Sequence, residues 1–268
     1  ISFLFSCNTD TNRSINFKFD NNKIHKMAFL SGDDLIFENI EKLIEISNLN
    51  KGGYVVIIPT SAKKEWSNHS LLQTKFYNKQ IVAVHILDLD KNISISRSEM
   101  LTIKNAKLIC FIGNNEKEFS SSIEILNLKE IISDAYTNGT VIAGLGNCAT
   151  ILGPEFYIPD NDEHKNFKLT SKPGFGLFTN TIIYELKYQS QIIDEITSET
   201  EKNNMSYLGI DKSSTVLIKN SETGVVVEGN IKYSSNESPG KEMSTGNTFK
   251  LPASKWHYQN ILGEIYNE

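Results

Sequence analysis

Apolar and polar segments alternate along the chain from about residue 26 onward. Short apolar runs, typical of buried β-strands, occur at 26–30, 54–58, 81–87, 108–112 and 141–143. Between these runs, apolar positions at helical spacing predict helices from Asp34 onward and over 68–77, 97–104 and 128–138, with Asp34 as the cap of the first helix. This alternation predicts an α/β fold: a doubly wound, mostly parallel sheet flanked by helices.

The last third of the chain has a different pattern. Short β runs with Gly and Asn turns occur at 207–210, 215–218, 224–228 and 231–233. They predict a small antiparallel extension of the sheet near the C-terminus. The segment 234–247 is polar and contains Pro239, Gly240 and Gly246, so we expect a surface loop there. Residues 26–268 are expected to form one domain.

The most informative segment is 140–153, where an apolar strand leads into a turn of small residues. The turn spans 144–148, and a helix is expected to begin at Ala149. In α/β hydrolases a turn of this kind raises the catalytic nucleophile above the sheet. By its place in the turn, the nucleophile position falls on Gly146, which has no side chain with which to attack. Ligands of such sheets bind at the carboxyl ends of the strands, so one rim is expected to hold the turns that follow Leu30, Ile58, Ile112 and Ala143.

Composition and charge narrow the function classes. The chain has 268 residues, a formal net charge of −5 and a pI near 5.7. Nucleic-acid binding needs clustered Lys and Arg, so that class is excluded. No apolar run approaches the roughly 20 residues that a membrane-spanning helix requires. The five histidines are His25, His69, His85, His164 and His257. No two of them are spaced as a zinc pair, so no metal site and no cofactor are expected.

The run from Ile1 to Cys7 is apolar, is closed by a small residue and a cysteine, and is followed by a polar tract. This pattern resembles the lipobox that ends a bacterial lipoprotein signal peptide, in which Cys7 becomes the lipidated first residue of the mature chain. Residues 1–25 are therefore expected to comprise a signal-peptide remnant, a lipidated cysteine and a tether. We expect an extracytoplasmic protein, periplasmic or at the outer membrane, held there by acyl chains alone.

Six short motifs, in order and at suitable intervals, resemble one known family. They are GGYVVIIPTS (52–61), AKLICFIGNNE (106–116), GTVIAG (139–144), GFGL (174–177), LGID (208–211) and GNTFKL (246–251). Over about residues 26–252 the chain resembles the cyanophycinase and dipeptidase E group of serine peptidases. This resemblance implies a sheet like that of class I glutamine amidotransferases. The substrate implied by the family is an aspartyl or β-aspartyl peptide.

The catalytic positions that the resemblance implies are replaced in this chain. The family's nucleophile turn, Gly-Thr-Ser-Ala-Gly-Ala, aligns with 144–149 (GLGNCA), so Gly146 stands at the serine. The family's Asp-Gln-His-Phe aligns with 184–187 (YELK), so Leu186 stands at the histidine. The family's Gly-Gly-Asp-Gln appears as GNNE at 113–116, and its basic residues after the histidine are absent. Acyl transfer needs an activated nucleophile and a base within hydrogen-bond reach, which glycine and leucine cannot supply.

The leading hypothesis is therefore a pseudoenzyme. Its fold is that of a peptidase, and it either binds a peptide or small molecule at the former active-site rim or serves as a scaffold for a partner. The space above Gly146 is expected to be either open or filled by Tyr184, Leu186 and Asn114. The residues expected to line the rim for a ligand are Gly113, Asn114, Asn115, Glu116, Asn147, Tyr184 and Glu185.

Two alternatives keep an active enzyme. In the first, Cys148 is a relocated nucleophile: it lies near the start of the predicted helix, whose dipole favours a thiolate, and His164 is the candidate base. The competing interpretation is that Cys148 replaces a packing glycine and points into the protein. In the second alternative, Ser61 is the nucleophile, although Ser and Thr after a strand more often close a turn or cap a helix.

Overall fold

The structure is a computed structural model and describes residues 25–60, 67–89, 94–113, 116–160, 168–178, 180–186, 190–235 and 238–252. Its strands are β1 (Met27–Ser31), β2 (Val55–Pro59), β3 (Val84–Ile86), β4 (Leu108–Ile112), β5 (Val141–Leu145), β6 (Glu155–Asp160), β7 (Lys168–Pro173), β8 (Thr181–Glu185), β9 (Ser206–Ile210), β10 (Thr215–Lys219), β11 (Thr223–Glu228), β12 (Asn230–Ser235), β13 (Ser238–Ser244) and β14 (Thr248–Lys250). Its helices are α1 (Ile40–Ile46), α2 (Ser67–Asn78), α3 (Arg97–Lys104), α4 (Glu116–Ile125), α5 (Leu128–Thr137) and α6 (Ser190–Lys202), with 3-10 helices η1 (Asp33–Leu35), η2 (Leu49–Lys51) and η4 (Gly146–Leu152).

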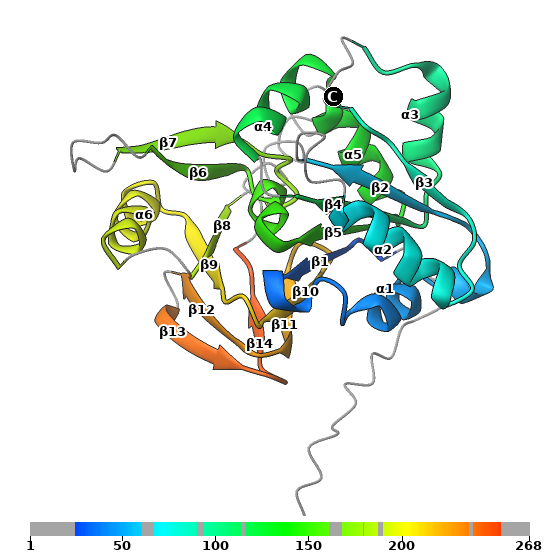
Figure 1. Cartoon of the computed structure of the whole chain (residues 1–268). Helices are drawn as coiled ribbons and strands as arrows, with labels where there is room; N and C mark the ends of the chain where they lie inside the picture. The colour runs from blue at the N-terminus through cyan, green and yellow to red at the C-terminus, as the bar shows by residue number, and fades with distance from the viewer. Residues whose placement is uncertain are drawn as a thin grey trace, which may run out of the picture.

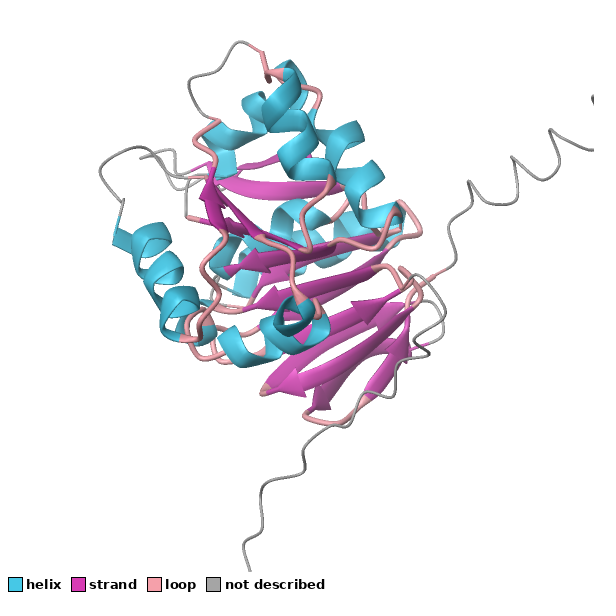
Figure 2. Ribbon diagram, turned by 90° about the vertical axis from the view of Figure 1, so that its right-hand side faces the viewer, coloured by secondary structure: helices cyan, strands magenta, loops and turns pink. Residues whose placement is uncertain are grey.

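A central sheet of eight described strands has the order β14-β11-β10-β1-β5-β4-β2-β3 (Figure 1). The five strands from β1 to β3 in this order are parallel, and β10, β11 and β14 pair antiparallel. Helices cover both faces of this sheet (Figure 2). The fold is therefore the predicted mixed α/β architecture, with a mostly parallel central sheet and extra antiparallel strands.

The core lies on both faces because the parallel strands are apolar at every position. Alternate residues such as Phe29 and Ile57 pack with α1 and α2 on one face, where Leu43 and Phe76 are fully buried. The intervening residues of the same strands pack against α3, α4 and α5 on the other face. A strand that is buried on both faces reads as a continuous apolar run, which is why the sequence pattern located β2 and β4.

The carboxyl ends of four parallel strands lie level with one another. Ser31 pairs with Leu145, Leu145 with Ile112, and Ile112 with Pro59. The turns that follow β1, β2, β4 and β5 therefore share one rim, as predicted. This register places the nucleophile turn in the middle of the rim, between the ends of β1 and β4.

A second sheet has the order β13-β12-β9-β8, and β6 and β7 form a separate hairpin. β8 and β9 are parallel, whereas β9, β12 and β13 are antiparallel. The chain crosses between the two sheets at residues 211–214, between β9 and β10, and at Gly229, between β11 and β12. Figure 1 shows this second sheet with α6 beside it, on the side of the molecule away from β3.

Several expectations about individual elements were wrong. The segment 234–247 is not a loop, because β13 pairs with β12 over most of its length. Asp34 caps no helix: it lies inside η1, and α1 begins only at Ile40. The residues after the nucleophile turn form the 3-10 helix η4 from Gly146, and no α-helix begins at Ala149. The extension is also larger than predicted and includes the parallel pair of β8 and β9.

Candidate functional site

The turn after β5 has the backbone geometry of a tight strand-to-helix turn. Gly146 has φ +64°, in the left-handed region, and begins η4. Gly144 is packed so closely that an added Cβ would lie 2.6 Å from the Cα of Ala149. Glycine suits both positions, since a left-handed φ favours glycine at 146 and position 144 has no room for a Cβ. The backbone is therefore a tight strand-to-helix turn, and the position predicted for a nucleophile carries no side chain.

The space that a side chain at position 146 would occupy is filled by two residues from the turn after β1. A Cβ on Gly146 would overlap the Oδ1 atom of Asp33, and it would lie 3.1 Å from the Cδ1 atom of Ile36. Asp33 belongs to η1, which hydrogen bonds hold against the β9–β10 connection, where the backbone N–H of Asp34 donates to the carbonyl of Lys212 at 2.9 Å. A carboxylate oxygen thus lies where a side chain at position 146 would begin.

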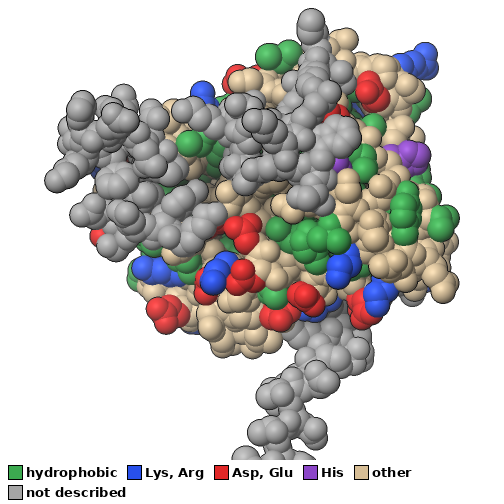
Figure 3. Space-filling model, in the orientation of Figure 1, with side chains coloured by type: hydrophobic (Ala, Val, Ile, Leu, Met, Phe, Trp, Pro, Cys, Tyr) green, Lys and Arg blue, Asp and Glu red, His purple; other side chains and the backbone are tan. Residues whose placement is uncertain are grey.

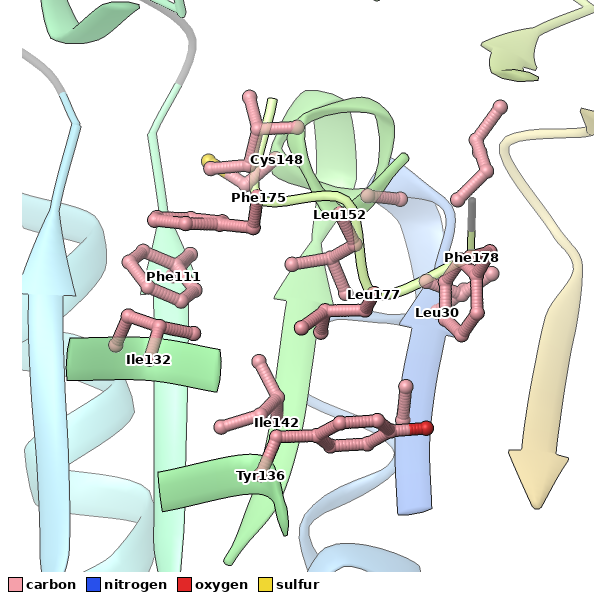
Figure 4. Packing of buried hydrophobic residues seen from close by; sticks show 14 of the residues in the cluster. Leu30, Phe111, Ile132, Tyr136, Ile142, Cys148, Leu152, Phe175, Leu177 and Phe178 are labelled. Atoms are coloured by element: carbon pink, nitrogen blue, oxygen red, sulfur yellow. The ribbon is translucent and has the colours of Figure 1, made fainter. Parts of the chain in front are cut away.

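Cys148 is the last residue of the turn, and its side chain is fully buried. Its thiol donates a hydrogen bond to the carbonyl of Gly113 at 3.3 Å, and the hydroxyl of Thr60 lies 3.1 Å from the sulfur. Figure 4 shows Cys148 at the upper end of the buried cluster, next to Phe175. The side chain therefore joins the ends of β2, β4 and β5, as a packing residue does. Cys110 is also a free, buried thiol, and burial raises its pKa.

Leu186, at the position that the resemblance assigns to the histidine, is held by the second sheet. It follows β8, its backbone N–H donates to the carbonyl of Ile210 at 2.9 Å, and its side chain is half-buried beside Tyr184. The ring of Tyr184 packs edge-on against Tyr207 on the face of β8 that α6 covers. Glu185 is buried and points to the opposite face, by the alternation of the strand. The three atoms nearest to an added Cβ on Gly146 belong to Asp33 and Ile36, not to Tyr184 or Leu186.

The remaining predicted rim residues are distributed as follows. Gly113 and Asn147 are half-buried at the ends of β4 and β5, and Glu116 is the first residue of α4. The carbonyl of Asn147 accepts a hydrogen bond from the hydroxyl of Thr150 at 2.9 Å. The other predicted site residues, Cys7, Ser61, Asn114, Asn115 and His164, lie outside the described residues.

A histidine to which the sequence pattern assigns no role lies in the crossover that follows β2. His69 is in the first turn of α2, after β2, and is buried. Burial lowers the pKa of its imidazole below the ordinary value of 6.5, and Asp88, after β3, partly opposes that change. A buried histidine that favours its neutral form is suited to packing or hydrogen bonding in this crossover. Within the described residues, no group of three or more His, Cys, Asp or Glu side chains is arranged to hold a metal ion.

Asp33 is the residue beside Gly146 that the sequence pattern does not single out. The pattern predicts only that the turn after Leu30 lies on the rim. Its relation to Gly146 depends on the pairing of β1 with β5, which joins residues more than 100 positions apart in the chain. The signal available from the sequence was an acidic residue directly after the strand that neighbours the nucleophile strand.

Comparisons with known proteins identify the family of this chain and agree with its fold. The family model of peptidase family S51 matches residues 29–226. A peptidase from an acI-B1 Actinobacterium is 18% identical, with a TM-score of 0.58 over 84% of this chain and 96% of its own. A Listeria monocytogenes EGD-e protein assigned to peptidase E is 17% identical, with a TM-score of 0.53 over 75% of this chain and 98% of its own. At these identities the likeness to solved structures shows the fold. No curated protein matches the chain. The family match covers most of the sequence, and the chain belongs to peptidase family S51, the family of dipeptidase E and cyanophycinase.

Proposed function

We propose that this protein is a non-catalytic member of its family that binds a peptide or small molecule at the former active-site rim, or acts as a scaffold there. The observation that carries the proposal is the glycine at position 146, which has no side chain with which to attack and has the carboxylate of Asp33 beside it. Glycine at position 146 offers no hydroxyl that the family mechanism could acylate. The rim itself keeps its strand ends and turns, which is what a binding role requires.

The positions around Gly146 support the same proposal. Leu186 cannot accept or deliver a proton. The thiol at Cys148 has no exposed surface and already donates to a backbone carbonyl, so a substrate carbonyl cannot reach it without displacement of the turn. Removal of a serine or a histidine from such a triad lowers the rate by several orders of magnitude. Both are replaced here.

Incubation with substrates of the family tests the proposal. We expect purified protein to release no new amino groups from aspartyl dipeptides, β-aspartyl dipeptides or cyanophycin above the rate in buffer. A matched preparation of the Asp33→Asn variant identifies any hydrolase that copurifies, because contamination does not respond to this change. Turnover that scales with protein concentration and changes in the Asp33→Asn variant contradicts the proposal.

The N-terminal pattern supports a proposal for location. We propose that Cys7 carries the acyl chains that hold the protein at a bacterial membrane on the extracytoplasmic side. Two or more acyl chains are needed for a stable anchor, and none of the described helices is long and apolar enough to cross a membrane. Expression of the precursor with a radiolabelled fatty acid tests this proposal. Label is expected in the wild-type protein and absent from Cys7→Ala, whereas label in neither protein contradicts it.

A further inference from the structure

The edge of the central sheet opposite the rim is formed by the beginnings of its parallel strands. Neighbouring pairs in the register form one row along this edge, from Lys250 on β14 to Val84 on β3. The connections that enter the five parallel strands gather there, on the right of Figure 1. We call this the lysine edge; it comprises Lys26, Lys219, Lys250 and the connections 47–54, 79–83, 105–107, 138–140 and 220–222.

Lysine dominates the charge of this edge. Lys79 pairs with Glu41, and Lys104, the last residue of α3, pairs with Asp134 of α5 at 2.7 Å. Glu45 lies nearby, in the last turn of α1. Positive charge remains in excess after these acidic residues are counted. The charged residues described within the edge itself are Lys26, Lys51, Lys79, Lys107, Lys219, Lys250 and Glu222.

The rim at the other end of the strands has the opposite charge. Among its described connections Lys212 is basic, and it pairs with Asp34 at 3.5 Å. A molecule whose charges are separated in this way takes a preferred orientation beside a charged surface. The acidic residues described in the rim connections are Asp33, Asp34, Glu38, Asp88 and Asp211, and Glu116 begins α4.

Apolar side chains are exposed at the lysine edge. Val82, in the connection 79–83, is 79% exposed, and Tyr77, at the end of α2, is 44% exposed. In Figure 3 hydrophobic side chains reach the surface at the right-hand edge of the view, where Figure 1 places α2 and β3. Basic residues beside exposed apolar and aromatic side chains are the combination that binds the interface of an anionic membrane.

Two glycines leave the surface around Lys107 free of side chains. A Cβ on Gly53 would lie 2.4 Å from the Cγ atom of Lys107, so the stem of the lysine lies across a residue without a side chain. Gly52 has nothing within 4 Å of an added Cβ. Lys107 itself is exposed. These glycines therefore place no side chain between the lysine and a flat partner.

We propose that the lysine edge docks on the anionic headgroups of a phospholipid bilayer, so that the rim faces away from the membrane. The chain enters β1 at Lys26, so the segment that joins Cys7 to the fold arrives at this edge. The inference deepens the proposed location and rests on it, because acyl chains on Cys7 bring the lysine edge to the membrane surface. Each lysine near an anionic surface raises the affinity about fivefold, and Val82 and Tyr77 insert among the headgroups.

Vesicle flotation of the full-chain Cys7→Ser variant tests docking without acyl chains. We expect this protein to bind vesicles of equal parts phosphatidylcholine and phosphatidylglycerol, and to be released by added salt. Binding to vesicles of phosphatidylcholine alone should be at least tenfold weaker. Addition of Lys51→Gln and Lys107→Gln together should weaken binding to the anionic vesicles at least tenfold, since two lysines are lost.

The matched control removes the same charge away from the lysine edge. It carries Lys129→Gln, in the first turn of α5, and Lys232→Gln, on β12, in the Cys7→Ser background. We expect this protein to bind anionic vesicles within about threefold of the Cys7→Ser protein, because neither lysine lies at the docking edge. Native far-UV spectra and unchanged thermal midpoints ensure that lost binding reports on the surface.

A fluorescent label identifies the surface that docks. In the Cys7→Ser background, Val82→Cys and Ser213→Cys each add one exposed thiol, whereas Cys110 and Cys148 are buried. We expect the emission of an environment-sensitive dye at position 82 to shift to shorter wavelength on anionic vesicles. The same dye at position 213, on the rim, should keep its emission.

Three results overturn the proposal: no flotation with anionic vesicles, equal loss of binding in the two double-lysine variants, or a dye shift at position 213 without one at position 82. Every protein in these tests lacks Cys7, so the tests do not depend on acylation. Absence of fatty-acid label from the wild type contradicts the proposed location without changing vesicle binding by the lysine edge, whereas absent flotation overturns only this inference.

Discussion

At the scale of single residues, Gly146 and Asp33 are complementary. A glycine takes φ +64° without the steric penalty of a Cβ, and the absence of that Cβ leaves room for the carboxylate of Asp33. A serine at position 146 would need both the left-handed backbone and a different position for Asp33. A side chain at position 146 therefore requires the exposed carboxylate of Asp33 to take another rotamer.

Substitution of Gly146 by alanine tests this complementarity. We expect Gly146→Ala to lower the free energy of unfolding by about 1.5–3 kcal/mol, the sum of a left-handed backbone penalty of about 1–2 kcal/mol and a smaller penalty of about 0.5–1 kcal/mol for displacing the exposed Asp33 carboxylate. Gly240→Ala is the matched control, because Gly240 has φ +59° and nothing within 4 Å of an added Cβ. In an Asp33→Ala background, Gly146→Ala should lose only about as much stability as Gly240→Ala. Urea denaturation measures all five proteins, namely the wild type, the three single variants and the double variant, and equal losses for both glycines in the wild-type background would refute the overlap.

Cys148 gives a second prediction at this scale. Because its thiol is fully buried and hydrogen-bonded to Gly113, we expect Cys148 to resist iodoacetamide in the folded protein and to react promptly in urea. Cys110, which is equally buried, serves as the internal reference for inaccessibility. Peptide mapping of a Cys7→Ser protein after a short pulse at neutral pH measures both sites. Alkylation of Cys148 far ahead of Cys110 would favour the relocated nucleophile.

At the scale of elements, the sequence located the strands that are buried on both faces but missed elements whose apolar pattern is weak. The apolar run 108–112 matches β4 at both ends, since every residue of that strand is buried. In contrast, β13 offers only Met243 as a buried apolar residue, because it is an edge strand with most of its length exposed. Its existence depends on backbone pairing with β12. The β6–β7 hairpin and α6 were missed in the same way.

Asn39 connects the elements that position Asp33. Its side-chain amide donates to Ser31 at the end of β1, to the carbonyl of Leu35 in η1 and to Thr215 at the start of β10, at 2.8–3.2 Å. We expect Asn39→Ala to lower the free energy of unfolding by about 2–4 kcal/mol, because several buried hydrogen bonds are lost at once.

The matched control for Asn39 is Asn105→Ala at the exposed end of α3, where the amide donates to the carbonyl of Leu101 at 2.9 Å. We expect a loss below about 1 kcal/mol there, since water replaces an exposed partner. Urea denaturation of both variants provides the comparison. An Asn39→Ala loss as small as that of Asn105→Ala would show that η1 is held in place without this amide.

At the scale of the whole molecule, the candidate site lies where two sheets meet. The connection 211–214 contacts η1, since the backbone N–H of Asp34 donates to the carbonyl of Lys212. The family fold could be predicted from six motifs that occur in order along the chain. The position of Asp33 beside Gly146 could not, because it depends on pairing between segments far apart in sequence.

The stability of the whole molecule should depend on pH through His69. Burial lowers the pKa of His69 in the folded state, so the unfolded chain binds this proton more readily. The neutral imidazole of His69 therefore contributes its full stabilisation to the folded state above the unfolded pKa of about 6.5. This stabilisation is lost as the pH falls from about 6.5 through the lower pKa of the folded state. We therefore expect the urea midpoint to fall less between pH 7.5 and pH 5 in His69→Gln than in the wild type. An equal fall in the two proteins would show that His69 does not contribute to the pH dependence of stability.

The central claim is that this rim contains no activated nucleophile, and it can be tested without knowledge of any substrate. A fluorophosphonate forms a covalent adduct with an activated serine, and intact-mass spectrometry detects the added mass directly. We predict an unchanged mass after prolonged incubation at neutral pH, with an active serine peptidase labelled in parallel. A stoichiometric adduct that peptide mapping places on the rim, at Ser61 or at any other hydroxyl there, would contradict the claim.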